Sequence, residues 1–213
     1  MPSIPPKPPL REARPAAVTF SSTSGPLQYI HMPAGPQIDL LMRSREIDQR
    51  YFAVRNITIG LANGRIRAAE LPSEDLVQAF LRNELALGTD ISPQHRTGVS
   101  LGNDFVSETD RSRIPAAAES IKANLIGCLA AAQIKDERVL RNALELAVTT
   151  NHHNLIANCC NYFSFFRNNM AYLSKMIGTI DGVLSKPDLR LPEDLAAELS
   201  QVKSILIRYL PRP

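Results

Sequence analysis

Apolar residues recur at alternating steps of three and four through the last hundred residues of the chain. The longest row lies between His152 and Ser185 and consists of Ile156, Cys159, Phe163, Phe166, Met170, Leu173, Ile177, Ile180 and Leu184. This spacing keeps one side of an α-helix against partner helices. The pattern therefore predicts one long helix over residues 152–185, with Gly178 and Gly182 as the places where an interruption is expected.

Three shorter amphipathic segments accompany this row. Pro115 stands in the first turn of a segment that ends near Gln133, Asp136 is positioned to cap the next, and Pro192 opens the last. The connections are short, so neighbouring helices are expected to pack antiparallel. The sequence predicts an all-α fold with a four-helix bundle over about 115–210, within a domain of residues 115–213.

Residues 37–87 show helical periodicity and are expected to form a helical pair ahead of the bundle. The first helix would end at Asn63-Gly64. The same dipeptide is also a turn signal for a β-hairpin, since the residues at 57, 59 and 61 alternate before it. An isolated two-stranded ribbon is marginal in water, and the rest of the chain is helical. Over 52–70 we therefore prefer the helix to the hairpin.

The second helix of the pair is expected to begin with Ser73 as its cap and to end at Gly88. Residues 88–114 then form a long polar loop, and a loop of this length is usually functional, mobile or a hinge. It contains Gly98-Val-Ser100-Leu-Gly102, which fits the nucleophile elbow of α/β-hydrolases. The polar residues before it give no buried strand to expose the serine, so we interpret the motif as a flexible loop.

Residues 1–36 contain nine of the 16 prolines and are predicted to form an extended or disordered arm. Within it, Pro6, Pro9 and Arg11 fit PxxPxR, the ligand pattern of SH3 domains, and are the candidate arm contacts. A solvated arm, or one docked on its own chain, is the simpler alternative. The arm has no apolar core for a Sec-type signal peptide. Its acid-poor Ser/Pro composition resembles type III secretion leaders, which leaves non-classical secretion open.

Positive charge is concentrated near the N-terminus, although the whole chain carries only +3. Residues 1–67 hold nine Lys or Arg against four Asp or Glu, which gives +5, and the remainder balances at −2. The candidate phosphate contacts are Arg43, Arg50, Arg65 and Arg67. A solvated, salt-bridged face is the default interpretation, and a phosphate-binding surface is the alternative.

A row without charge follows a second side of the predicted long helix. Its members are Asn151, Asn154, Asn158, Asn161, Phe165, Asn168 and Tyr172. Solvated helix faces usually carry Glu, Lys and Arg, which form helices better than Asn does. An ordinary polar surface, coverage within the chain and an intermolecular contact all remain open. We select these residues as the candidate partner contacts.

Metal, cofactor and membrane sites are not expected. His152-His153 and Cys159-Cys160 are ligand types, but residues seven apart on one helix are separated by about 10 Å. Three cysteines make no disulfide framework, so a reducing compartment is expected. The least charged stretch, Leu146–Phe166, contains too many Asn, His and Thr residues to span a bilayer, and a soluble protein is expected.

These patterns contain no recognisable catalytic motif, and we expect no enzymatic activity. The leading hypothesis is a protein-interaction or assembly protein that contacts a protein partner, or a second copy in a homo-oligomer. It would do so through the arm and the row of Asn and aromatic residues. One alternative is a secreted bacterial effector or accessory factor whose arm is a secretion leader. Another is a nucleic-acid-coating or virion-type structural protein.

Overall fold

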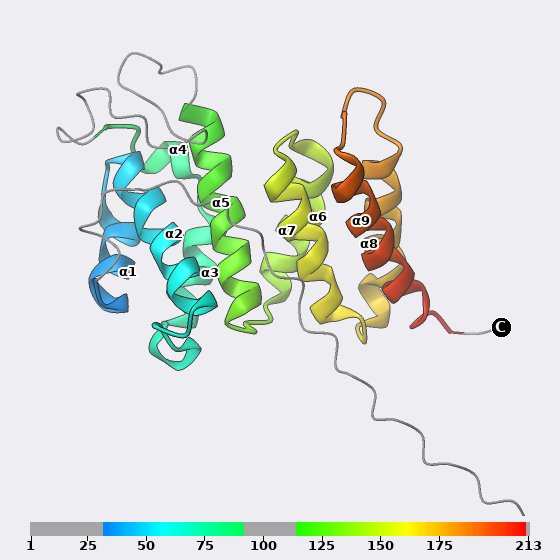
Figure 1. Ribbon diagram of the computed structural model, residues 1–213, viewed down its shortest axis with the longest axis horizontal. Coiled ribbons are helices and arrows are strands. Elements are labelled where there is room, and N and C mark those ends of the chain that lie inside the picture. The colour runs from blue at the N-terminus through cyan, green and yellow to red at the C-terminus, as the bar shows by residue number, and fades with distance from the viewer. Residues whose placement is uncertain (1–31, 92–113, 212–213) are drawn as a thin grey trace, which may run out of the picture.

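The computed structural model describes residues 32–91 and 114–211 (Figure 1). The helices are α1 (Ala34–Arg43), α2 (Ile47–Ala62), α3 (Ser73–Leu81), α4 (Glu84–Leu87), α5 (Ile114–Ala131), α6 (Glu137–Thr149), α7 (His153–Phe163), α8 (Met170–Leu184) and α9 (Glu193–Ile207), with 3-10 turns η2 (Ala68–Glu70) and η5 (Ser164–Phe166). No β-strand occurs in these two ranges, so the all-α prediction is confirmed. Residues 1–31 of the expected arm and 92–113 of the expected loop lie outside the described residues.

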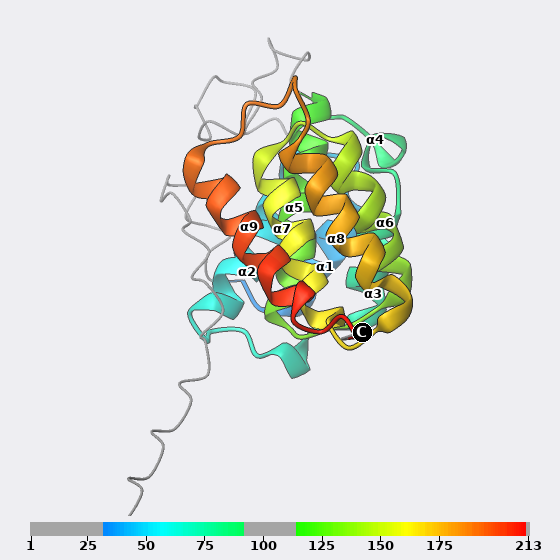
Figure 2. The same cartoon turned by 90° about the vertical axis from the view of Figure 1, so that its right-hand side faces the viewer.

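Successive helices alternate between two layers. One layer contains α1, α3, α6 and α8, and the other contains α2, α5, α7 and α9 (Figure 2). Within each layer a helix packs on the members before and after it, and the two layers also pack closely against each other, as α1 does on α2 and α6 on α7. The alternation brings the start of α1, the turns before α3, α6 and α8, and the end of α9 to one end of the stack. We call this the lower end, after its position in Figure 1.

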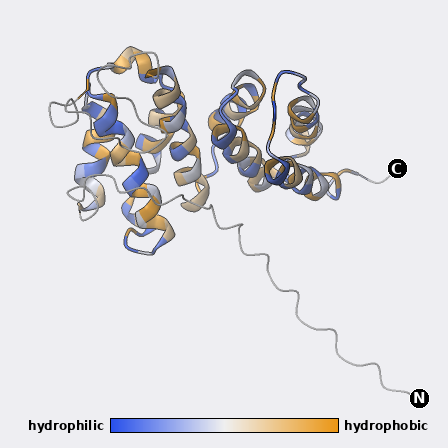
Figure 3. Ribbon diagram, turned by 45° about the horizontal axis from the view of Figure 1, so that its top comes forward, coloured by the Kyte–Doolittle hydropathy of each residue, from blue (hydrophilic) through white to orange (hydrophobic). Residues whose placement is uncertain are grey.

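The C-terminal part differs from the expected four-helix bundle. Residues 114–207 form five helices, α5 to α9, and α5 also packs closely against α2 and α3 of the preceding part. The apolar core is correspondingly continuous through both parts. Figure 3 shows hydrophobic and hydrophilic residues alternating along nearly every helix, as expected where each helix has one side against its neighbours.

The predicted long helix over 152–185 is wrong. The structure divides this segment into α7 and α8, and the chain reverses between Phe163 and Met170. The step pattern continues across the reversal because both helices turn their apolar sides toward the same core. Asn168 and Asn169 are poor helix formers at this point, and Asn169 becomes the N-cap of α8. The two glycines named as interruption points lie inside α8.

The preference for a helix over a hairpin within 52–70 is confirmed, because α2 continues to Ala62 and ends at Asn63-Gly64. Asn63 is the C-cap of α2, and Gly64 follows with a φ of 74°, the left-handed conformation that glycine adopts readily. The first helix of the expected pair is nevertheless two helices, α1 and α2, separated at residues 44–46. The expected cap, Ser73, is instead the first residue of α3, and Pro72 is the N-cap, without a side-chain capping bond. Gly88 ends α4 rather than α3.

A buried arginine lies at the break between α1 and α2. Arg50 is completely buried, and its guanidinium donates to the Glu84 carboxylate at 2.8 Å and to the Ser44 carbonyl at 2.9 Å. It also donates to the carbonyls of Glu84 and Gly88, at 3.0 and 2.7 Å. Burial lowers the pKa of Arg50, and the neighbouring carboxylate opposes this shift. One side chain thus fixes three chain segments at the end of the stack opposite the lower end, which we call the upper end.

Close backbone approach tightens the same junction. Gly88 has a φ of 149°, and a Cβ there would lie 2.6 Å from the Arg45 carbonyl oxygen. The Ile47 amide donates to the Asp90 carbonyl at 2.8 Å. The segment after α4 therefore lies directly against the start of α2, and glycine is required where the two backbones meet.

Candidate functional site

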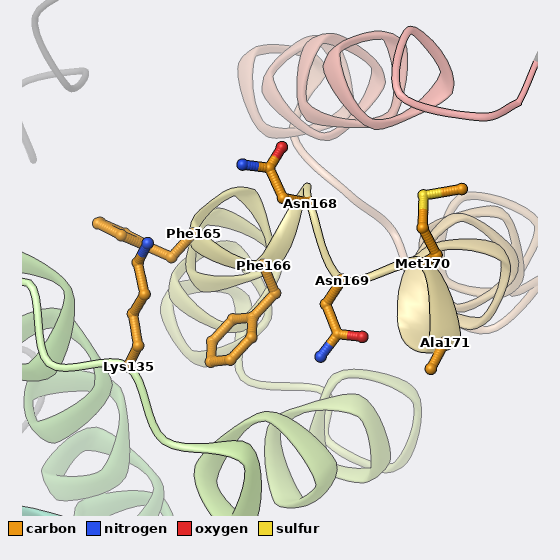
Figure 4. A pocket seen from close by; sticks show the side chains of 7 residues that line it. All are labelled: Lys135, Phe165, Phe166, Asn168, Asn169, Met170 and Ala171. Atoms are coloured by element: carbon orange, nitrogen blue, oxygen red, sulfur yellow. The ribbon is translucent and has the colours of Figure 1, made fainter.

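A depression of about 550 Å³ lies at the lower end of the stack, between two turns (Figure 4). Its lining residues are Lys135, Phe165, Phe166, Asn168, Asn169, Met170 and Ala171. Lys135 comes from the turn between α5 and α6, and the others come from η5, the reversal and the first residues of α8. We call this feature the α7–α8 groove.

The side chains of the reversal divide into an anchored set and an exposed set. Phe166 is 8% exposed and packs against Tyr162, with ring centroids 5.4 Å apart. Asn169 donates its side-chain amide to Glu137 at 3.2 Å. Met170, in contrast, is 52% exposed, the highest value for a large apolar side chain among the described residues. The buried ring and the amide hold the turn in place while the methionine faces outward.

Tyr162 joins the two turns that form the groove. Its buried hydroxyl donates to the Ile134 carbonyl at 2.8 Å and accepts from the Asp136 amide at 3.1 Å. Burial raises the pKa of Tyr162 to about 12, so the hydroxyl keeps its proton. Because Ile134 and Asp136 flank Lys135, this hydroxyl fixes the position of the lysine relative to α7. The groove is therefore built on a rigid support.

The row of Asn and aromatic residues is divided between structural and exposed positions. Asn158 donates to the Ala123 carbonyl of α5 at 2.9 Å, and Asn161 donates to Glu198 of α9 at 2.6 Å. Asn151 accepts from Lys186 at 2.9 Å. These hydrogen bonds join the three asparagines to other parts of the same chain. Those of Asn158 and Asn161 link α7 to both of its neighbours in the layer.

The remaining members of the row do not continue one stripe, because the helix reverses between Phe163 and Met170. Asn154 is exposed on α7, and Tyr172 is half-buried against the core on α8. Only Phe165 and Asn168 line the groove. The sequence pattern missed Lys135 and Asn169 as lining residues and wrongly assigned Met170 to the core, whereas Phe166 belongs to the core as assigned. The pair of asparagines within the heptads was the signal for the turn.

The candidate phosphate contacts are dispersed. Arg50 is a correction, because it is completely buried and bound to Glu84, and its guanidinium does not reach the surface. Arg43 is exposed and lies 3.8 Å from Asp39, and Arg67 pairs with Glu70 at 2.6 Å. Arg65 is exposed and donates to the Asn56 carbonyl at 3.4 Å. The paired arginines match the salt-bridged interpretation. The candidate arm contacts Pro6, Pro9 and Arg11 lie outside the described residues.

A Ser–His pair also occurs, but its proton arrangement is unsuited to nucleophilic catalysis. Ser120 Oγ lies 3.0 Å from His152 Nε2, while His152 Nδ1 accepts the Leu155 amide at 3.2 Å as the N-cap of α7. An accepting Nδ1 places the proton of a neutral ring on Nε2, which then donates to the serine. A general base needs the opposite tautomer. The pair therefore joins α5 to the start of α7.

The thiols are buried structural groups. Cys128 packs with Thr58, their Sγ and Oγ1 atoms 2.8 Å apart, and burial raises the pKa of Cys128 to about 12. Burial likewise raises the pKa of Cys159, and that of Cys160 to about 12. A thiol is reactive as the thiolate, so all three are held in the inert form. Within residues 32–91 and 114–211, no three His, Cys, Asp or Glu side chains are placed to hold a metal ion.

None of the helices in the described part of the chain has the length and apolarity to cross a membrane. Comparison of the chain with protein-family models, curated proteins and solved structures gave no match.

Proposed function

We propose that this chain is a non-enzymatic protein-interaction module that binds a segment of a protein partner in the α7–α8 groove. The observation that carries the proposal is the groove itself, with Met170 and Phe165 presented beside the amides of Asn168 and Asn169. Aromatic residues and Met are enriched at the centres of protein interfaces. The amides supply donors and acceptors for a partner backbone.

The surrounding fold supports a binding role. The groove is attached to Tyr162 and Phe166, which are both buried, so we expect its shape to change little when Met170 is replaced. Stacked helices of this kind present side chains on a rigid frame, and helical-repeat proteins use such frames to bind other proteins. The Ser120–His152 pair and the cysteines have structural roles, which favours binding over catalysis.

The proposal is tested by selecting peptides from an unbiased library on the full chain and measuring their affinities for two matched variants. Met170→Gln changes the groove, and Leu85→Gln changes an apolar residue on α4, 41% exposed at the upper end. Fully burying a methionine side chain contributes about 1.5–3 kcal/mol, and 52% of Met170 is exposed, so Met170→Gln is expected to weaken binding by up to about tenfold. Leu85→Gln should leave affinity unchanged.

Two results would contradict this function. One is an absence of enriched peptides, and the other is an equal response of the selected peptides to both variants. Light scattering on the same proteins tests a second copy as the partner. A mass above that of the monomer that falls in Met170→Gln alone would identify the groove as a contact between copies.

A further inference from the structure

An arginine in the reversal between α7 and α8 is held against the end of α9. Arg167 is exposed, and its guanidinium carbon lies 5.4 Å from the centroid of the Tyr209 ring. The ring attracts the cation through its π electrons and leaves the N–H donors available for an oxyanion. No acceptor or carboxylate among the described residues contacts the Arg167 guanidinium. The side chain is therefore restrained and still able to bind an anion.

The charges at the end of α9 are arranged differently from those at the start of α6. Arg138, in the first turn of α6, pairs with Asp136 and Glu74 at 2.8 and 2.9 Å. Arg208 is exposed like Arg167, and neither forms an ion pair with a carboxylate in the described part of the chain. The lower end therefore presents two cations beside α9 that no contacting acid neutralises.

The surroundings favour a carboxylate on a protein segment over the phosphates of a nucleic acid. A nucleic acid is bound by many cations that follow its backbone, and Glu137, exposed beside the groove, would repel such a chain. The exposed neighbour of Arg167 is instead the apolar Met170. The two are three residues apart, so their Cα atoms lie within about 11 Å, which an extended segment of four residues covers. One segment can therefore contact both side chains.

We infer that Arg167 binds an acidic side chain of the partner segment whose apolar residue contacts Met170. This inference rests on the proposed function and identifies the partner class of that site as an acidic protein segment. Tyr209 is a positioning residue, because its ring holds the guanidinium on the α9 side of the reversal. The contact surface thus extends from the α7–α8 groove to the end of α9.

The test uses two pools of synthetic peptides with the same apolar residues, one with Glu and the other with Gln at the polar positions. The full-length parent chain should bind the Glu pool about fivefold more tightly than the Gln pool, the most that one exposed ion pair usually contributes. Arg167→Gln should remove this preference and leave the affinity for the Gln pool unchanged. Arg190→Gln is the matched control, because Arg190 is also exposed but lies in the connection between α8 and α9, at the upper end.

Two substitutions of the tyrosine test the positioning role. Tyr209→Ala should lower the preference for the Glu pool about two- to threefold, because the guanidinium loses the ring beneath it. Tyr209→Phe keeps the ring and should keep the preference. Equal preferences in these two variants would contradict a role for the ring.

Equal affinity of the parent for the two pools, or the same loss of preference in Arg167→Gln and Arg190→Gln, would overturn the inference. Arg167-dependent binding of a single-stranded oligothymidylate without a preference for Glu would also overturn it, because the anion would then be a phosphate. Should both pools bind equally and in a Met170-dependent way, the proposed function stands and only the acidic class is lost. Binding of neither pool would count against both.

Discussion

The two ends of the stack are held together by different kinds of interaction. At the upper end, a completely buried ion pair between Arg50 and Glu84 holds α1, α2 and α4 together. At the lower end, the turn between α7 and α8 is held by Phe166 and Tyr162 and leaves Met170 exposed. A buried ion pair therefore holds the helices together at the upper end, whereas a large apolar side chain is exposed beside the groove at the lower end.

The buried Arg50 and the exposed Met170 show that the type of a side chain is a weak guide to its exposure. A buried charge is tolerated only when its partners are close and its donors are used, and Arg50 meets both conditions. The buried ion pair at the upper end is expected to contribute mainly to stability, and the exposed groove at the lower end is the proposed binding site, so the two roles can be tested separately.

The largest effect is expected at the upper end. Arg50→Met leaves Glu84 buried without this partner, and removal of one member of a buried pair typically costs about 3–5 kcal/mol. Denaturant unfolding followed by circular dichroism measures the loss. Arg43→Met is the control, because Arg43 is 83% exposed and its replacement should change the free energy of unfolding by less than about 0.5 kcal/mol. Similar losses in both variants would contradict a special role for the buried pair.

A smaller effect is expected from the support of the groove. Tyr162→Phe removes a hydroxyl that both donates and accepts, which leaves the Ile134 carbonyl and the Asp136 amide without this partner. The expected loss is about 1–3 kcal/mol in the free energy of unfolding. Tyr209→Phe is the matched control, since Tyr209 is 39% exposed near the C-terminus. A loss in the control equal to that in Tyr162→Phe would rule out the bridging role.

The row of asparagines provides a third test. Asn158→Ala removes the bond to the Ala123 carbonyl and should destabilise the chain by about 1 kcal/mol. Asn154→Ala, on the exposed side of the same helix, should change stability by only a few tenths. Neither substitution should alter peptide affinity. Loss of binding in Asn154→Ala without loss of stability would restore the row as a contact surface.

The smallest effect is expected in the loss of stability at low pH. Asp136 caps α6, and its pKa is lowered, mainly by hydrogen bonds from Arg138. Because the folded pKa lies below the unfolded value of 3.8, the stabilisation is complete above that value and is lost as pH falls through the folded pKa. Asp136→Asn retains a capping side chain and removes the titration. Unfolding between pH 6 and about pH 2 should therefore show a shallower acid loss in the variant than in the parent, and identical slopes would contradict this.

Much of the fold followed from local signals in the sequence. Pro115, Asp136, Pro192 and the Asn63-Gly64 pair mark helix ends where the structure has them, because these residues act on the backbone next to them. The reversal after Phe163 was missed because two helices on one core share an apolar spacing. Arg50 was misplaced because its partners lie 34 or more residues away and at residue 44, a combination that only the folded chain brings together.

The candidate site was predictable only in part. Phe165 and Asn168 belong to the uncharged row, and both line the groove. Lys135 comes from a different turn, and its position depends on the Tyr162 hydroxyl, which no periodicity shows. Met170 fits the apolar heptads, so its exposure could not be inferred from spacing.

The separation of stability from binding is measured most directly on Met170→Gln. The two quantities are the free energy of unfolding and the affinity for peptides selected on the parent chain. We expect the free energy of unfolding to stay within about 0.5 kcal/mol of the parent, since Met170 is half-exposed, while affinity falls by up to about tenfold. Unchanged affinity, or a large loss of stability, would contradict the assignment of the α7–α8 groove as the contact site.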